Sequence, residues 1–178
     1  MNAALKFADF VDGITRIFSK IASVLLLALI ALVFSNVAGR YVFGNPPIWM
    51  QELEWHLLVP ISLLGIIVLL LENGHVRVDM IYERVSPKAK CWIDLISMSC
   101  GAAVALLFIK YSYGFVNNSF YVFEGSPDPG GLSGRWVLKG FIPVAFLFVA
   151  LQCLANAVRQ VEKLKTNFNT PNTTEGNA

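Results

Sequence analysis

Apolar residues gather in four long runs along the chain, and polar stretches separate them. The runs cover about residues 21–43, 48–71, 92–109 and 136–158. A helix that crosses the hydrocarbon core of a bilayer needs about 20 mostly apolar residues. Helices suit these runs, because lipid offers no partners for backbone amides and the runs lack the alternation of barrel strands. The pattern predicts an all-α integral membrane protein with four transmembrane helices.

The connection between the second and third runs carries a shorter apolar pattern. Four residues there follow helical spacing on one face: Val78, Ile81, Tyr82 and Val85. We expect a short amphipathic helix over about residues 77–85 that lies along the membrane surface, with Arg77 and Asp79 as structural contacts. Ser86 and Pro87 then predict the N-cap and first position of the third membrane helix.

Composition agrees with a membrane protein. The chain is 56% apolar and only 15% charged, whereas a soluble domain is usually about 25% charged. The net charge of +2 is too small to favour nucleic acid as a partner. We expect one four-span membrane domain over residues 1–165 and a polar, disordered tail over residues 166–178.

The positions of the basic residues predict the orientation, since lysine and arginine concentrate in cytoplasmic segments. Ten of the 14 lie in the two terminal segments and in the connection between the second and third runs. An even number of spans places both termini on one side. Both termini are therefore predicted in the cytoplasm, and the connections at residues 44–47 and 110–135 are predicted to face outward.

The sequence offers little support for catalysis. It contains neither a phosphate-binding loop nor a Cys/His cluster, and its three cysteines form no C-x-x-C pair. We therefore expect a protein that is not an enzyme and that has no catalytic residue, metal site or cofactor.

Polar residues within the apolar runs are costly in lipid and point to contacts. Arg40 ends the first run at the level where Glu52 and Glu54 begin the second, so Arg40 can pair with either carboxylate. His56 lies one turn below Glu52, where it can serve as a proton or ligand site or contact a neighbouring helix. Amide side chains can hold helices together in lipid: Asn36, Gln152 and Asn156.

Three stretches, in this order, resemble one known family. They are NVAGRYVFGNPPIWMQELEW at the end of the first run, NGHVRVDMIYERVSPKAKCWID in the connection, and SPDPGGLSGRWVLKGFIPVAFLFVALQ at the fourth run. Together they are similar to the small membrane subunit (DctQ type) of tripartite ATP-independent periplasmic transporters, the TRAP family. The family often has two adjacent glutamates at the start of the second span, whereas Leu53 separates Glu52 from Glu54 here.

The resemblance implies a role and a set of partners. The small subunit is expected to brace a large TRAP membrane subunit, which carries an organic acid by ion symport, and to help dock a periplasmic substrate-binding protein. The bacterial inner membrane and its lipids are the implied surroundings. By position, structural roles fall on Arg40, Glu52 and Glu54.

Two other functions compete with this interpretation. A self-sufficient small transporter would move a solute without a partner subunit. A haem-b membrane anchor of a redox enzyme would need axial histidines on paired helices, whereas His56 is the only histidine within a predicted span.

Overall fold

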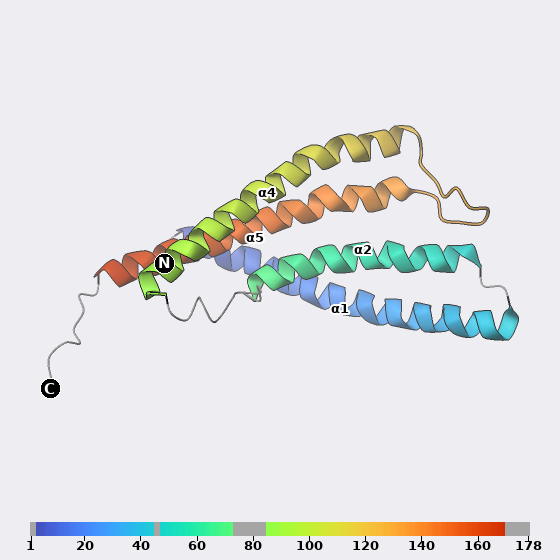
Figure 1. Cartoon of the computed structure of the whole chain (residues 1–178), viewed down its shortest axis with the longest axis horizontal. Helices are drawn as coiled ribbons and strands as arrows, with labels where there is room; N and C mark the ends of the chain where they lie inside the picture. Colours follow the sequence, from blue (N-terminus) through green and yellow to red (C-terminus); the bar gives the residue numbers. More distant parts are fainter. Residues whose placement is uncertain (1–2, 45–46, 73–84, 170–178) are drawn as a thin grey trace.

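A computed structural model describes residues 3–44, 47–72 and 85–169 of the chain. The described residues form four helices and no strand. The helices are α1 (Ala3–Phe43), α2 (Ile48–Leu71), α4 (Pro87–Tyr121) and α5 (Arg135–Asn169), as Figure 1 shows. All four are long and apolar enough to cross a membrane. The prediction of an all-α protein with four membrane helices is confirmed.

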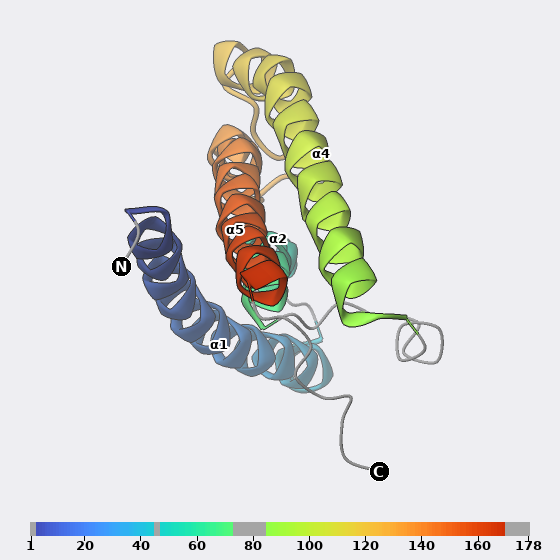
Figure 2. The same ribbon diagram turned by 90° about the vertical axis from the view of Figure 1, so that its left-hand side faces the viewer.

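The helices form two hairpins that pack side by side. The C-terminal ends of α1 and α4 lie at one end of the bundle, and the C-terminal ends of α2 and α5 lie at the other (Figure 1). Helix α5 contacts each of the other three helices, and its most extensive contact is with α4. Figure 2 shows α5 between α4 on one side and α1 on the other. Helix α5 is therefore the central element of the bundle.

The apolar core lies where α2, α4 and α5 meet. Its buried residues are Leu64, Ile67, Leu70, Met98, Ala102, Ala105, Val149, Ala150 and Cys153. Many of these are small, as is usual where membrane helices approach closely. At Gly101 of α4, an added Cβ would lie 3.1 Å from Cys153 Sγ of α5. Glycine at this position therefore sets the close approach of the two helices.

The start of α4 follows the prediction. Ser86 is its N-cap, with φ −60° and ψ 150°, and the hydroxyl accepts a hydrogen bond from Ala89 N at 3.4 Å. Pro87 occupies the first helical position, where its missing N–H costs nothing. Ser86 and Pro87 therefore define where α4 begins.

Three helices extend beyond the predicted spans. Helix α1 begins at Ala3 instead of near residue 21, α4 continues to Tyr121, and α5 ends at Asn169 inside the predicted tail. Hydropathy marks the apolar part of a helix only, and charged residues such as Lys110 end that part without ending the helix. The loop between α4 and α5, which was predicted to face outward, therefore covers residues 122–134 instead of 110–135. The amphipathic helix predicted at residues 77–85 falls almost entirely outside the described residues.

Candidate functional site

The loop between α4 and α5 is attached to α2 through the carboxylate of Glu52. This side chain is almost completely buried, with 5% of the residue exposed. It accepts hydrogen bonds from Ser126 Oγ, from the backbone N–H of Leu132 and, at 3.1 Å, from Arg135 Nη2. Each donor lies in the loop or at the first position of α5. Glu52 therefore holds the loop and the start of α5 against α2.

Turn residues make this close approach possible. Gly130 has φ +85°, a left-handed conformation that glycine adopts without steric cost. At Gly131, an added Cβ would overlap the side chain of Ser126 and lie 2.7 Å from Glu52 Oε2. The backbone N–H of Ser126 also donates to the carbonyl of Leu132 at 3.1 Å. The Pro- and Gly-rich stretch is thus an ordered loop. Residue 131 must be glycine, because a Cβ there would overlap Ser126 and Glu52.

A second carboxylate, Glu124, orders the other end of the same loop. Ser119 Oγ donates to Glu124 Oε2 at 2.6 Å, and Lys139 Nζ forms an ion pair with the same oxygen. Lys139 also lies over the ring of Phe115, with its Nζ 4.1 Å from the ring centroid. The hydrogen bonds from Lys139 and Ser119 hold the pKa of Glu124 below its usual range, against an opposing effect of desolvation. The carboxylate therefore ties the end of α4 to the first turns of α5.

The side chain of Arg135 connects the loop to the aromatic face of α2. Its guanidinium carbon lies 5.1 Å from the ring centroid of Trp55, a distance typical of cation–π contacts.

His56 Nδ1 lies 2.7 Å from the carbonyl oxygen of Glu52 in the same helix, so Nδ1 carries the proton that it donates. His56 therefore bonds its own helix instead of a neighbouring one. Among the described residues, Arg135 Nε and His56 Nε2 are buried without a hydrogen-bond partner.

The predicted ion pair between Arg40 and Glu52 or Glu54 is not formed among the described residues. Arg40 is exposed and forms no ion pair with a described residue, while Glu52 pairs with Arg135. Glu54 is half-buried and accepts a hydrogen bond from Asn36 Nδ2 of α1 at 2.6 Å. The two carboxylates leave opposite sides of α2, so one reaches α5 and the other reaches α1. Two further predicted contact residues, Arg77 and Asp79, lie outside the described part of the chain.

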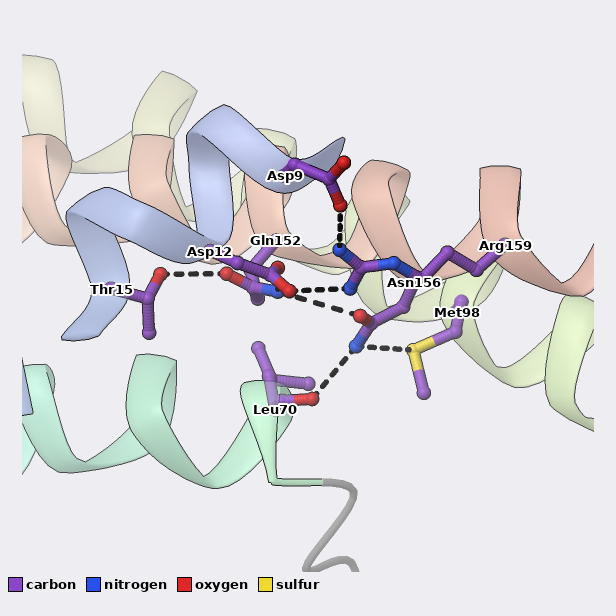
Figure 3. A network of polar contacts seen from close by, with 8 residues as sticks. All are labelled: Asp9, Asp12, Thr15, Leu70, Met98, Gln152, Asn156 and Arg159. Carbon is purple, nitrogen blue, oxygen red and sulfur yellow. Dashed lines mark hydrogen bonds and ion pairs between the residues drawn. The ribbon is translucent and has the colours of Figure 1, made fainter. Parts of the chain in front are cut away.

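At the opposite end of the bundle, a buried glutamine joins α1 to α5. Gln152 is 0% exposed. It accepts a hydrogen bond from Thr15 Oγ1 at 2.6 Å and donates to Asp12 Oδ1 at 2.9 Å. It also donates a longer bond of 3.4 Å to Asn156 Oδ1, one turn along α5. Figure 3 shows Gln152 between Thr15 and Asp12.

Two more residues of α5 extend this network. Asn156 Nδ2 donates to the carbonyl of Leu70 in α2 at 2.7 Å (Figure 3). Arg159 forms ion pairs with Asp12 at 2.5 Å and with Asp9 at 3.0 Å. One face of α5 thus bonds α1 and α2 within two helical turns. The prediction that Asn36, Gln152 and Asn156 hold helices together is confirmed.

Sequence reasoning missed several members of these two sites. It did not identify Asp9, Asp12 or Arg159 as partners, although the two aspartates lie one turn apart on an N-terminal helix that hydropathy alone does not detect. It also missed Arg135, which it counted only for orientation. No local pattern in the sequence shows which helix the loop from Ser126 to Gly131 contacts.

Neither site resembles a metal centre. In residues 3–44, 47–72 and 85–169, no group of three or more His, Cys, Asp or Glu side chains could hold a metal ion. The carboxylates of Glu52 and Glu124 are instead occupied by hydroxyl, amide and cationic donors. Groups bound in this way fix helices in place.

Comparison with known proteins identifies the family of the chain. Residues 11–163 match the family model of the DctQ component of tripartite ATP-independent periplasmic transporters. The chain is also similar to the sialic acid TRAP transporter permease protein SiaT of Haemophilus influenzae (strain 86-028NP), with 25% identity over 129 residues. That match covers 70% of this chain and 20% of the relative, so the chain spans about one fifth of the length of that permease. The chain belongs to the DctQ component family of the TRAP transporters and is a multi-pass small membrane subunit.

Proposed function

We propose that this chain is a non-catalytic small permease subunit of a secondary active, ion-coupled uptake transporter for organic acids. It braces the large TRAP membrane subunit and helps to dock a periplasmic substrate-binding protein. Its DctQ family membership and its likeness to part of a TRAP permease support this proposal.

The observation that carries the proposal is the uncovered apolar surface of α1. The most apolar 18-residue stretch of α1 has no buried residue, whereas 39% of the corresponding stretch of α5 is buried. Large side chains such as Leu27 and Phe34 are 68% and 73% exposed. Apolar surface of this extent packs against lipid or another membrane protein. The exposed face of this apolar stretch of α1 is thus available to a larger subunit, while α5 holds the bundle together.

The length of the permease relative supports a separate carrier part. Four fifths of that protein has no counterpart in the matched segment. The buried side chains of Glu52 and Gln152 are also bonded to neighbouring helices of the same chain. A subunit built in this way supplies a rigid support, and the movement of the substrate belongs to the partner.

The proposed orientation places both termini in the cytoplasm and the loop at residues 122–134 in the periplasm of a bacterial inner membrane. The excess of basic residues in the terminal segments and the connection at residues 72–91 supports this orientation. In it, the loop held by Glu52 and Glu124 faces the side on which a binding protein arrives. A loop fixed at both ends is pre-organised for docking, which lowers the entropy lost on binding.

Co-purification and transport assays test the assignment. Tagged chain is co-expressed with a large TRAP membrane subunit and a binding protein, and uptake of a labelled organic acid is measured in proteoliposomes. We expect a stable complex and uptake only with all three proteins and an ion gradient. Accumulation by the chain alone would establish a self-sufficient transporter, and a haem absorption band in the pure protein would establish a haem-b anchor. Either result overturns the proposal.

A pair of glycine variants tests the docking role. In Gly131→Ala, the new Cβ overlaps the side chain of Ser126 and crowds Glu52, so the loop must move away from α2. In Gly125→Ala, the new Cβ has no atom within 4 Å. We expect the first variant to weaken cross-linking to the binding protein while the complex with the large subunit persists, and the second to behave as wild type. Equal cross-linking in both variants would show that the loop does not take part in docking.

A further inference from the structure

A groove runs between α1 and α2 near the inner end of the bundle, where these helices pack side by side (Figure 1). Its mouth is a cavity of about 670 Å³. The lining includes Arg16, Ser19 and Lys20 of α1 and Val68, Leu71 and Glu72 of α2. Lys20 directly precedes the apolar run of α1, and Glu72 directly follows the last apolar residue of α2. The mouth therefore lies at the level where the hydrocarbon core meets the headgroups.

The groove continues from this mouth into the apolar part of the bundle. A second cavity of about 280 Å³ shares Ser19, Val68 and Glu72 with the first. It extends along residues within the apolar runs, including Leu26 of α1 and Leu69 of α2, each of which is 46% exposed. The groove thus has a polar mouth at the interface and an apolar floor that faces the lipid tails.

The charges at the mouth are unevenly compensated. Arg16 and Lys20 lie one turn apart on the same face of α1 and are both exposed. Neither forms an ion pair with a residue in the described part of the chain. Asp12 also lines the mouth, but it already bonds Arg159 and Gln152 on α5. Two cations on one wall therefore remain available to an anion, and the exposed Glu72 remains available to a cation on the other.

We propose that this groove binds one phosphatidylethanolamine molecule of the inner leaflet. Its phosphate contacts Arg16 and Lys20, its ammonium donates to Glu72, and one acyl chain lies along Leu26, Gly65 and Leu69. This headgroup carries a phosphate beside an ammonium with N–H donors. These two groups match the cations on the α1 wall and the carboxylate on the α2 wall. Phosphatidylcholine offers no N–H donor to Glu72, and phosphatidylglycerol offers no cation. The lipid fills the space between α1 and α2 and fixes the depth of both helices.

Native mass spectrometry of the full chain, purified from bacterial membranes in mild detergent, tests the site. Phosphatidylethanolamine, phosphatidylcholine and phosphatidylglycerol are added in turn, and the fraction of protein that retains one lipid is measured. We expect preferential retention of phosphatidylethanolamine. In the double variant Arg16→Gln/Lys20→Gln this retention should fall roughly tenfold or more, since each cation near a lipid surface contributes about 1 kcal/mol. Glu72→Gln should remove the preference over phosphatidylglycerol.

Gly65→Leu tests the apolar part of the groove without changing any charge. A Cβ at Gly65 meets no atom within 4 Å, so the leucine side chain grows into open space and blocks the path of the acyl chain. We expect a loss of lipid retention with unchanged helical circular dichroism. Lys163→Gln removes an exposed cation of α5 outside the groove and should leave retention unchanged. Equal retention of the three lipids by wild type, or full retention by both Gly65→Leu and the double variant, would overturn the proposal.

Discussion

Replacing Gln152 with leucine should destabilise the bundle, because the side chain lies at the centre of the polar network that joins α5 to α1 and α2. Leucine has a similar volume but bonds neither Thr15 Oγ1 nor Asp12 Oδ1, which Gln152 now reaches at 2.6 and 2.9 Å. The Thr15 hydroxyl can turn to a carbonyl of its own helix, and Asp12 keeps Arg159 at 2.5 Å. Both groups therefore recover part of the loss.

The magnitude follows from the number of bonds lost. A buried group that loses its partner costs about 1–3 kcal/mol in water-soluble proteins, and measured interhelical bonds in membranes average about 0.6 kcal/mol with a maximum near 1.7. With two good bonds and one longer bond removed, we expect a loss of about 1–3 kcal/mol in the free energy of unfolding. This corresponds to a roughly 5- to 150-fold change in the folding equilibrium.

Unfolding in mixed micelles of mild detergent and dodecyl sulfate, followed by tryptophan fluorescence, measures this change. Gln51→Leu is the matched control, because Gln51 is an exposed glutamine of α2. Its free energy of unfolding should stay within about 0.5 kcal/mol of wild type. Adding Thr15→Val to Gln152→Leu should recover part of the loss, since the unpaired hydroxyl is then absent. Equal effects of the two leucine substitutions would refute the network as a source of stability.

Three further predictions concern the end of the bundle at which Glu52, Glu124 and Arg40 lie. Glu52→Gln removes the charge that faces Arg135 and leaves one side-chain oxygen for the donors at Ser126 and Leu132, so amide exchange across residues 122–134 should accelerate. Glu54→Gln keeps an acceptor for Asn36 and should not change this exchange. Because the pKa of Glu124 is lowered, its bond with Lys139 stabilises the loop above the ordinary carboxyl pKa of about 4.3. This stabilisation is lost as the pH falls through the lowered pKa. The loss of loop protection on acidification should therefore be smaller in Glu124→Gln than in wild type, as measured by amide exchange. Arg40→Glu should leave the unfolding of the isolated chain unchanged, because Arg40 has no described ion-pair partner, and should alter only co-purification with the large subunit; a large stability change in the isolated chain would contradict this.

The four membrane helices and the start of α4 were predictable because they depend on local signals. An apolar run long enough to cross a bilayer leaves its backbone few alternatives to a helix. Ser86 followed by Pro87 is likewise a local start signal that tertiary contacts do not need to support. Helix ends beyond the apolar runs, such as Ala3 of α1 and Tyr121 of α4, were missed because polar helical turns carry no hydropathy signal.

The partners of the polar residues were harder to predict than their importance. Glu52 was identified as a contact residue from its depth and charge, yet its cation is Arg135, 83 positions away, instead of the nearby Arg40. Proximity along the chain favoured Arg40, but the contact of α5 with α2 brings Arg135 to Glu52. A single sequence without a packing arrangement does not contain that information.

The placement of the polar bonds explains how four helices can form a rigid part in a solvent that does not drive them together. Lipid tails are as apolar as leucine, so burial alone does little to bring membrane helices together. Small residues such as Gly101 and Ala105 allow close contact between α4 and α5, but they leave sliding along the helix axes almost free. The bonds of Glu124 with Ser119 and Lys139 oppose sliding between α4 and α5. The bonds of Gln152 and Glu52 oppose sliding of α5 against α1 and α2, because a shift of one turn separates donor from acceptor. A bundle locked in this way can keep the exposed face of α1 at constant depth while a neighbouring protein moves.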